Sequence, residues 1–346
     1  MSLAILAIMA AAFAASLIVT VLAWRAGVLD MPNARSSHVN PTPRAGGLGV
    51  MAGLGAGALA ASAFALSGGP LAGILIIAAA FAVMGFADDL ITLGEAGKLI
   101  ASVCLCIALA AVAGPVTHIP VDGATGISLP VWLGWAGSAL FVFVAVNAVN
   151  FMDGSDGMLP AVMIPASIGL AVAGLVAGVN ASVIAGAALA AALAGFMLFN
   201  WHPARVFAGD VGALGAGAAY AGGALALAGH GFPGSLWLAP LFVLVFLADV
   251  LLTLLRRARH GRFSLQAHRE HAYQRLIDGG WSHGRVAAVY GGLTVLIVLT
   301  GLAAAQGPDI APFIAFWIWT AILIALHILA GRVTGGKPGP GAKNRP

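Results

Sequence analysis

Charged side chains are scarce in this chain of 346 residues. Asp, Glu, Lys and Arg together make up 8% of it, while hydrophobic residues make up 61% and the mean hydropathy is +1.01. A soluble domain carries about 25% charged residues, so the composition excludes that class and indicates a polytopic membrane protein. The net charge of +4 is explained by loops that face anionic lipid headgroups, so no nucleic acid partner is expected.

Cysteine is nearly absent as well. Cys104 and Cys106 are the only two, and both lie within one apolar run. Residues two positions apart on a helix point in different directions, so this pair favours neither a disulfide nor a metal site. The chain offers no ligand set for a soft metal.

Long apolar runs, by contrast, recur along the whole sequence. A helix needs about 20 mostly apolar residues to cross the hydrocarbon core of a bilayer. The predicted fold class is therefore an all-α polytopic membrane protein with about eleven transmembrane helices. They cover residues 3–24, 47–66, 70–87, 97–114, 131–150, 158–177, 180–199, 212–229, 236–255, 286–305 and 312–331.

The Lys and Arg residues fall on one side of this alternating arrangement. The five connections near residues 67–69, 115–130, 178–179, 230–235 and 306–311 contain none of the sixteen. By the positive-inside rule, the N-terminus is expected outside and the C-terminus in the cytoplasm. Residues 1–331 then form a single transmembrane domain, and the Gly-, Pro- and Lys-rich residues 332–346 form a flexible cytoplasmic tail.

Acids and amides gather at the ends of three predicted spans, all on the expected cytoplasmic side. Carboxylate and amide oxygens are the ligands that Mg²⁺ prefers. Each group alone is also explained by helix capping or a turn, but three groups on one membrane face favour a site. The groups are Asp88 and Asp89 after the third span, Asn147, Asn150, Asp153 and Asp156 after the fifth, and Asp210 before the eighth.

Spacing separates the expected roles of these residues. Asp88 and Asp89 are rotated by about 100° on a helix, so different partners are expected for them. Asn147 and Asn150 share a face if the helix continues that far. Asp249, within the ninth span, either borders the site or forms a structural ion pair.

The loop after the ninth span is rich in basic residues. Its first half, from Arg256, is expected to rest at anionic headgroups. In its second half, His268, Arg269 and His271 are close enough on a helical turn to converge on a phosphate or sugar, although a solvated amphipathic helix also fits them.

Residues 35–47 form a further loop with basic residues, prolines and a Gly pair, which either closes over an anion or simply connects two helices. Five motifs then occur in one order along the chain: residues 41–47, Asp88 and Asp89, residues 147–154, Gly209 with Asp210, and residues 268–271. Together they resemble the polyprenyl-phosphate N-acetylhexosamine-1-phosphate transferase family, over essentially the whole chain. The resemblance implies a catalytic domain at residues 1–331 in the bacterial inner membrane, with its cleft facing the cytoplasm. It also implies a UDP-sugar donor, undecaprenyl phosphate as acceptor, release of UMP, Mg²⁺ with Mn²⁺ as a substitute, and a homodimer.

Roles for individual residues follow from the same resemblance. Asp210 and Asn150 would bind the metal. The catalytic candidates are Asp88, Asp89, Asp153 and Asp156. The substrate-binding candidates are Arg44, Lys98, Asn147, His268, Arg269 and His271.

Finer questions stay open at this point. Residues 268–275 look more like bacterial members that begin O-antigen or related surface polysaccharides than like the enzyme of peptidoglycan synthesis. The donor sugar is GlcNAc or a 6-deoxy sugar such as FucNAc or QuiNAc. Direct displacement is preferred over a phosphorylated Asp88. The alternative class is an ion- or proton-coupled transporter, but Asp122 and Asp309 are the only acids on the opposite side.

Overall fold

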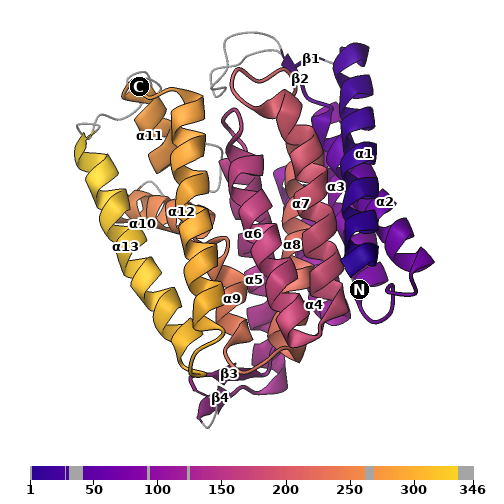
Figure 1. The fold of residues 1–346 in the computed structure, drawn as a ribbon. Helices are drawn as coiled ribbons and strands as arrows, with labels where there is room; N and C mark the ends of the chain where they lie inside the picture. The colour runs from indigo at the N-terminus through magenta and orange to yellow at the C-terminus, as the bar shows by residue number, and fades with distance from the viewer. Residues whose placement is uncertain are drawn as a thin grey trace.

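The computed structural model describes residues 2–27, 29–30, 42–91, 94–122, 125–261 and 269–333 of a helical bundle (Figure 1). Ten described helices are long and apolar enough to cross a membrane, and one bent pair makes eleven, so the predicted fold class is confirmed. The tail predicted at residues 332–346 lies almost entirely outside the described residues. The long helices are α1 (Ser2–Ala26), α2 (Gly46–Ala63), α3 (Leu71–Ile91), α4 (Glu95–Ala113), α5 (Val131–Met152), α6 (Met158–Ala177), α7 (Asn180–Asn200), α8 (Gly209–His230), α10 (Leu244–Arg259), α12 (His283–Ala304) and α13 (Ala311–Val333).

The predicted ninth span is broken, contrary to the continuous helix expected over residues 236–255. α9 (Ser235–Leu241) and α10 meet at an angle of 66°. Pro240 lies inside α9 and lacks the N–H that would bond to the carbonyl of Leu236, and proline is a common cause of such kinks. The break tilts α10 away from the line of α9.

Short elements close the two ends of the bundle. β1 (Leu29–Asp30) pairs antiparallel with β2 (Thr42–Pro43), and β3 (His118–Pro120) with β4 (Gly126–Ser128). In Figure 1, the first hairpin and α11 (Ala272–Asp278) lie at the upper end, and the second hairpin lies at the lower end.

The described Lys and Arg residues that the sequence assigns to one membrane side lie at one end of this bundle. Arg25 lies in the last turn of α1, Lys98 near the start of α4, and Arg332 in the last turn of α13. The ends of α1 and α13 lie at the upper end in Figure 1, together with α11, and Lys98 contacts Asp210 at the start of α8. Cationic side chains of consecutive loops therefore share one surface, which the sequence assigns to the cytoplasm.

α8 is the central helix of the bundle. Its residues from Val211 to Leu227 are all buried, and most of them are Gly or Ala. Small residues let neighbouring backbones approach closely, which is how helices associate in lipid without a hydrophobic driving force between them. A Cβ on Gly85 would lie 2.6 Å from the Asp210 carbonyl, so α3 packs directly against the start of α8.

The turn that begins α8 is held by α2. The amides of Gly46 and Gly47 donate to the carbonyls of Phe207 and Ala208, both at 3.0 Å. Gly209 has φ +65°, in the left-handed region that favours glycine. These contacts fix the backbone from which Asp210 projects.

Replacing Gly47 with Ala tests this packing. The new methyl group would press on the Ala208 carbonyl oxygen and the Gly212 backbone nitrogen, neither of which can move independently of α8. We expect Gly47→Ala to lower the free energy of unfolding by about 1–3 kcal/mol, measured by thermal unfolding in detergent.

Gly55→Ala is the matched control, because it lies in the same helix and a Cβ there meets nothing within 4 Å. It should be neutral or stabilising by up to about 1 kcal/mol. Equal effects of the two substitutions would contradict the packing argument.

Candidate active site

Four polar side chains from four helices form one connected group at the upper end of the bundle. Lys98 Nζ lies 2.5 Å from Asp88 Oδ2 and 2.8 Å from Asp210 Oδ2. Asn150 Nδ2 donates to Asp210 Oδ1 at 2.9 Å. The ends of α3 and α5 and the starts of α4 and α8 therefore converge, as the sequence hypothesis requires.

Asp89 faces different partners from its neighbour Asp88. Its Oδ1 lies 3.7 Å from Arg44 Nη1, and its carboxylate also accepts the backbone N–H of Asp210. A Cβ at Gly209 would stand 3.1 Å from Asp89 Oδ2, so this glycine leaves the space that Asp89 fills. The carboxylate thus sits at the N-terminus of α8, where free backbone N–H groups favour negative charge.

Asp153 follows the last residue of α5 and joins the same electrostatic group. Burial raises the pKa of Asp153 well above its ordinary value of 3.8, and the nearby charges of Asp210 and Asp89 raise it further, while Arg44 lowers it. The site thus places carboxylates close enough to repel one another.

Two predicted residues of the same segment bond elsewhere. Asp156 Oδ2 accepts the Ala204 amide at 3.1 Å and lies 2.8 Å from His202 Nδ1, so it ties the α5–α6 turn to the α7–α8 turn. Asn147 Nδ2 donates to the Phe143 carbonyl within α5 at 2.8 Å. Both lie near the site, but neither joins the group around Lys98 through these contacts.

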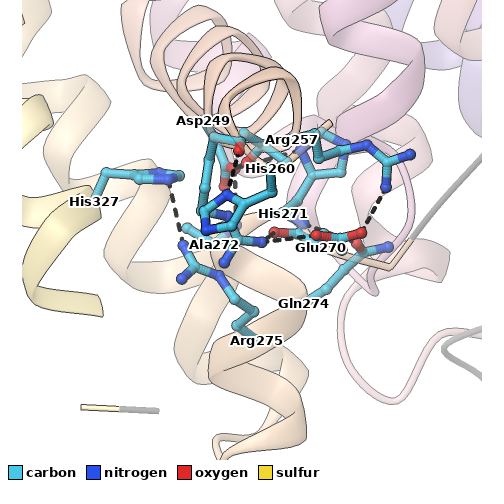
Figure 2. Close-up of polar contacts among 11 residues, drawn as sticks. Asp249, Arg257, His260, Glu270, His271, Ala272, Gln274, Arg275 and His327 are labelled. Atoms are coloured by element: carbon cyan, nitrogen blue, oxygen red, sulfur yellow. Dashed lines mark hydrogen bonds and ion pairs between the residues drawn. The ribbon is translucent and has the colours of Figure 1, made fainter. Parts of the chain in front are cut away.

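The basic segment after α10 folds back onto α10, and Figure 2 shows part of these contacts. His271 is 4% exposed, and its Nδ1 lies 3.4 Å from Asp249 Oδ1. Arg269 Nη2 contacts Asp278 Oδ1 at 3.0 Å. His268 lies outside the described residues, so its predicted role stays a prediction.

Tyr273 connects this segment to the site, which the sequence did not reveal. Its hydroxyl donates to the Phe151 carbonyl at 3.4 Å, and a Cβ on Gly154 would overlap that hydroxyl. Gly154 was the available signal, because a glycine next to Asp153 permits such a close approach.

The first half of the basic loop is also partly occupied. Arg257 Nη1 lies 2.6 Å from Glu270 Oε1, and Arg256 Nη2 lies 3.1 Å from Glu270 Oε2. These two arginines hold the chain before α11, in addition to any contact with headgroups.

The donor set fits a hard divalent cation held jointly with a substrate. No group of three or more His, Cys, Asp or Glu side chains in the described part of the chain could hold a metal unaided. Mg²⁺, however, commonly binds one or two carboxylates, with water and substrate phosphates completing its shell. Asp210 fits that mode, because its repulsion with Asp89 and Asp153 would be relieved by a cation.

An all-helical bundle with carboxylates, an amide and cations gathered at one end defines a polytopic membrane protein with a cluster of charged residues at one membrane surface. Comparison with known families agrees with this class, since the model of Glycosyl transferase family 4 matches residues 71–228. That range includes Asp88, Lys98, Asn150 and Asp210. The chain belongs to this family of membrane transferases.

Similar curated proteins fall into two groups. The chain is 30% identical to the decaprenyl-phosphate N-acetylglucosaminephosphotransferase of Mycolicibacterium smegmatis, over 83% of this chain and 77% of that protein. It is 31% identical to a phospho-N-acetylmuramoyl-pentapeptide-transferase of Synechococcus sp., over 86% of each. A probable undecaprenyl-phosphate N-acetylglucosaminyl 1-phosphate transferase of Bacillus subtilis is 25% identical, over 92% of this chain and 87% of that protein. These identities establish the family and do not separate its branches.

The raised pKa of Asp153 predicts a pH-dependent stability. The folded protein binds a proton at this carboxyl more readily than the unfolded chain does, so stability falls as pH rises from about 4 through the raised pKa. Asp153→Asn removes the titration. We expect its melting temperature to exceed that of the unmodified protein by a margin that grows between about pH 4 and pH 8, measured in EDTA.

Asp309→Asn provides the control for that series, because Asp309 is exposed in the loop before α13. The melting temperature of Asp309→Asn should change with pH in the same way as that of the unmodified protein. A constant margin for Asp153→Asn across the pH range would show that Asp153 titrates normally.

Proposed function

We propose that this protein transfers an N-acetylhexosamine-1-phosphate from a UDP-sugar to undecaprenyl phosphate and releases UMP. The observation that carries the proposal is the Lys98 ammonium held between Asp88 and Asp210, with Asn150 bonded to the same Asp210. A cation beside carboxylates and an amide, at a membrane surface, suits the meeting of two phosphorylated substrates. The names of the relatives, which act on polyprenyl phosphates and N-acetylated sugars, support the same reaction.

Charge neutralisation is the main requirement of this reaction. The donor diphosphate and the acceptor phosphate repel each other, and four carboxylates of the site add to that repulsion. Lys98 and Arg44 offset part of it. Asp210 and Asn150 would hold Mg²⁺, which would supply positive charge to offset the negative charge that develops on the leaving UMP.

The chemistry we propose is a direct in-line displacement. An oxygen of the lipid phosphate forms a bond to the donor's β-phosphorus as the bond from that phosphorus to the bridging oxygen breaks, and UMP leaves. Asp88, bonded to Lys98, deprotonates or orients the lipid phosphate, and Asp89 supports it. Asp153, which lies near Asp210, is assigned a place beside the donor, and Asp156 holds the loop that carries Asp153.

The remaining details of the proposal come from the sequence. The site faces the cytoplasm of a bacterial inner membrane, because the cationic loops lie at the same end. The product starts a lipid-linked O-antigen or other envelope glycan, and the donor carries GlcNAc or a 6-deoxy sugar such as FucNAc or QuiNAc. The family resemblance adds a homodimer as the expected working unit.

Release of UMP tests the assignment directly. Purified protein supplied with UDP-GlcNAc, undecaprenyl phosphate and MgCl₂ should form UMP and prenyl-diphosphoryl sugar. Asp88→Asn and Asp210→Ala should each lower turnover by at least about a hundredfold, because each removes a charge at the reacting phosphates. Asp309→Asn makes a comparable change at the opposite end of the bundle and should retain normal turnover.

Near-normal turnover in both site variants would refute the site assignment. An ion- or proton-coupled transporter would instead show ion flux in proteoliposomes, without UMP. Exchanging the donor for UDP-FucNAc or UDP-QuiNAc in the same assay identifies the sugar.

A trapped adduct separates the two mechanisms. We expect no sugar-phosphate on the protein when it is incubated with UDP-sugar and Mg²⁺ without lipid acceptor, because the attacking oxygen then is missing. Intact-mass spectrometry measures this. An adduct on Asp88 would replace direct displacement with a two-step route.

A further inference from the structure

Asp249 is a buried carboxylate in α10 that the proposed reaction does not use. It is 4% exposed. A carboxylate removed from water is costly unless donors surround it. The hydrogen-bond donors around Asp249 therefore indicate which parts of the fold this carboxylate holds together.

Most of those donors belong to the start of α11. The backbone amides of Ala272 and Tyr273 donate to Asp249 at 2.8 Å and 3.2 Å. His271 Nδ1 lies 3.4 Å away, and Figure 2 shows Ala272 and His271 beside Asp249. The hydroxyl of Tyr290 in α12 donates at 2.6 Å. Asp249 thus joins three helices and caps the first turn of α11 from outside that segment.

Other contacts hold the same segment to α10. The Glu270 carboxylate forms ion pairs with Arg256 and Arg257, which both lie in the last turn of α10. The Gln274 side chain closes the cap by accepting the His271 amide at 3.2 Å. α10, the half of the broken span that carries Asp249, therefore holds the start of α11, while Arg275 near the end of α11 contacts His327 of α13.

α11 in turn touches the part of α5 that supplies the site. Tyr273 contacts Phe151 and Gly154. Phe151 directly follows Asn150, and Gly154 directly follows Asp153. A shift of α11 would therefore move the backbone that carries two residues of the site.

We propose that Asp249 is a positioning residue for the sugar-nucleotide donor: it fixes α11, and α11 fixes the end of α5 where the donor diphosphate binds. Asp249 touches no substrate and acts through α11. This inference rests on the proposed transferase function.

Asp249→Asn tests it, since the amide keeps the shape of the side chain and replaces an acceptor with a donor that faces other donors. We expect the KM for the UDP-sugar to rise about tenfold or more, because charge-assisted hydrogen bonds to α11 are lost. The KM for undecaprenyl phosphate should stay within about twofold, because the acceptor is placed on Asp88 and Lys98.

Tyr290→Phe is the matched control. It removes a hydrogen bond from the same carboxylate but leaves the contacts with α11 in place. It should lower the melting temperature while leaving the donor KM within about twofold. Equal increases of the donor KM in both variants would mean that the network is merely structural and would overturn the proposal.

A readout independent of activity completes the test. Hydrogen exchange of residues 269–278 should accelerate in Asp249→Asn, with exchange in α8 unchanged; unchanged exchange in residues 269–278 overturns the proposal. If that variant does not fold, Gln274→Ala, which removes the other arm of the cap, should give the same two changes in weaker form, and a normal donor KM there overturns it. Absence of UMP from the unmodified protein would refute the transferase assignment instead, without affecting the exchange result.

Discussion

The close approach of three helices to the start of α8 is the constraint on which the site depends. Gly47 and Gly85 allow α2 and α3 to contact the backbone around Asp210, and α5 delivers Asn150 from another side. In lipid, apolar surface gives helices little reason to associate, so small residues and hydrogen bonds provide the cohesion. The packing that holds the bundle together is therefore also what places the four helix ends around one point.

Charged side chains at this end of the bundle are stabilised where they are paired with opposite charges or hydrogen-bond partners. Lys98 is held by two carboxylates, Asp89 by Arg44 and the amide of Asp210, and Asp249 by donors from α11 and α12. Charged groups at membrane depth are costly, and pairing reduces that cost. The catalytic candidates and the Asp249 network are separate groups, but they meet at the end of α5, which carries Asn150 and touches Tyr273.

The break in the ninth span gives α10 a direction of its own. A straight helix would have continued the line of α9, whereas the 66° bend tilts α10 and the arginines at its end. Those arginines then face Glu270, so residues expected to rest at headgroups also hold the segment before α11. The direction of α10, rather than the composition of the loop, therefore determines the position of the basic residues at its end.

The sequence by itself determined the membrane class, the number of spans, the end of the bundle at which the described cationic helix ends lie, and the residue types that gather there. Hydrophobic length and charge placement are local properties, so they can be read directly from the chain. Only the tertiary structure decided the partners: Lys98 between Asp88 and Asp210, Asp156 turned to Ala204, and Tyr273 against Gly154. Those contacts depend on which helices are neighbours and how they are rotated, and close packing between segments far apart in the chain sets both.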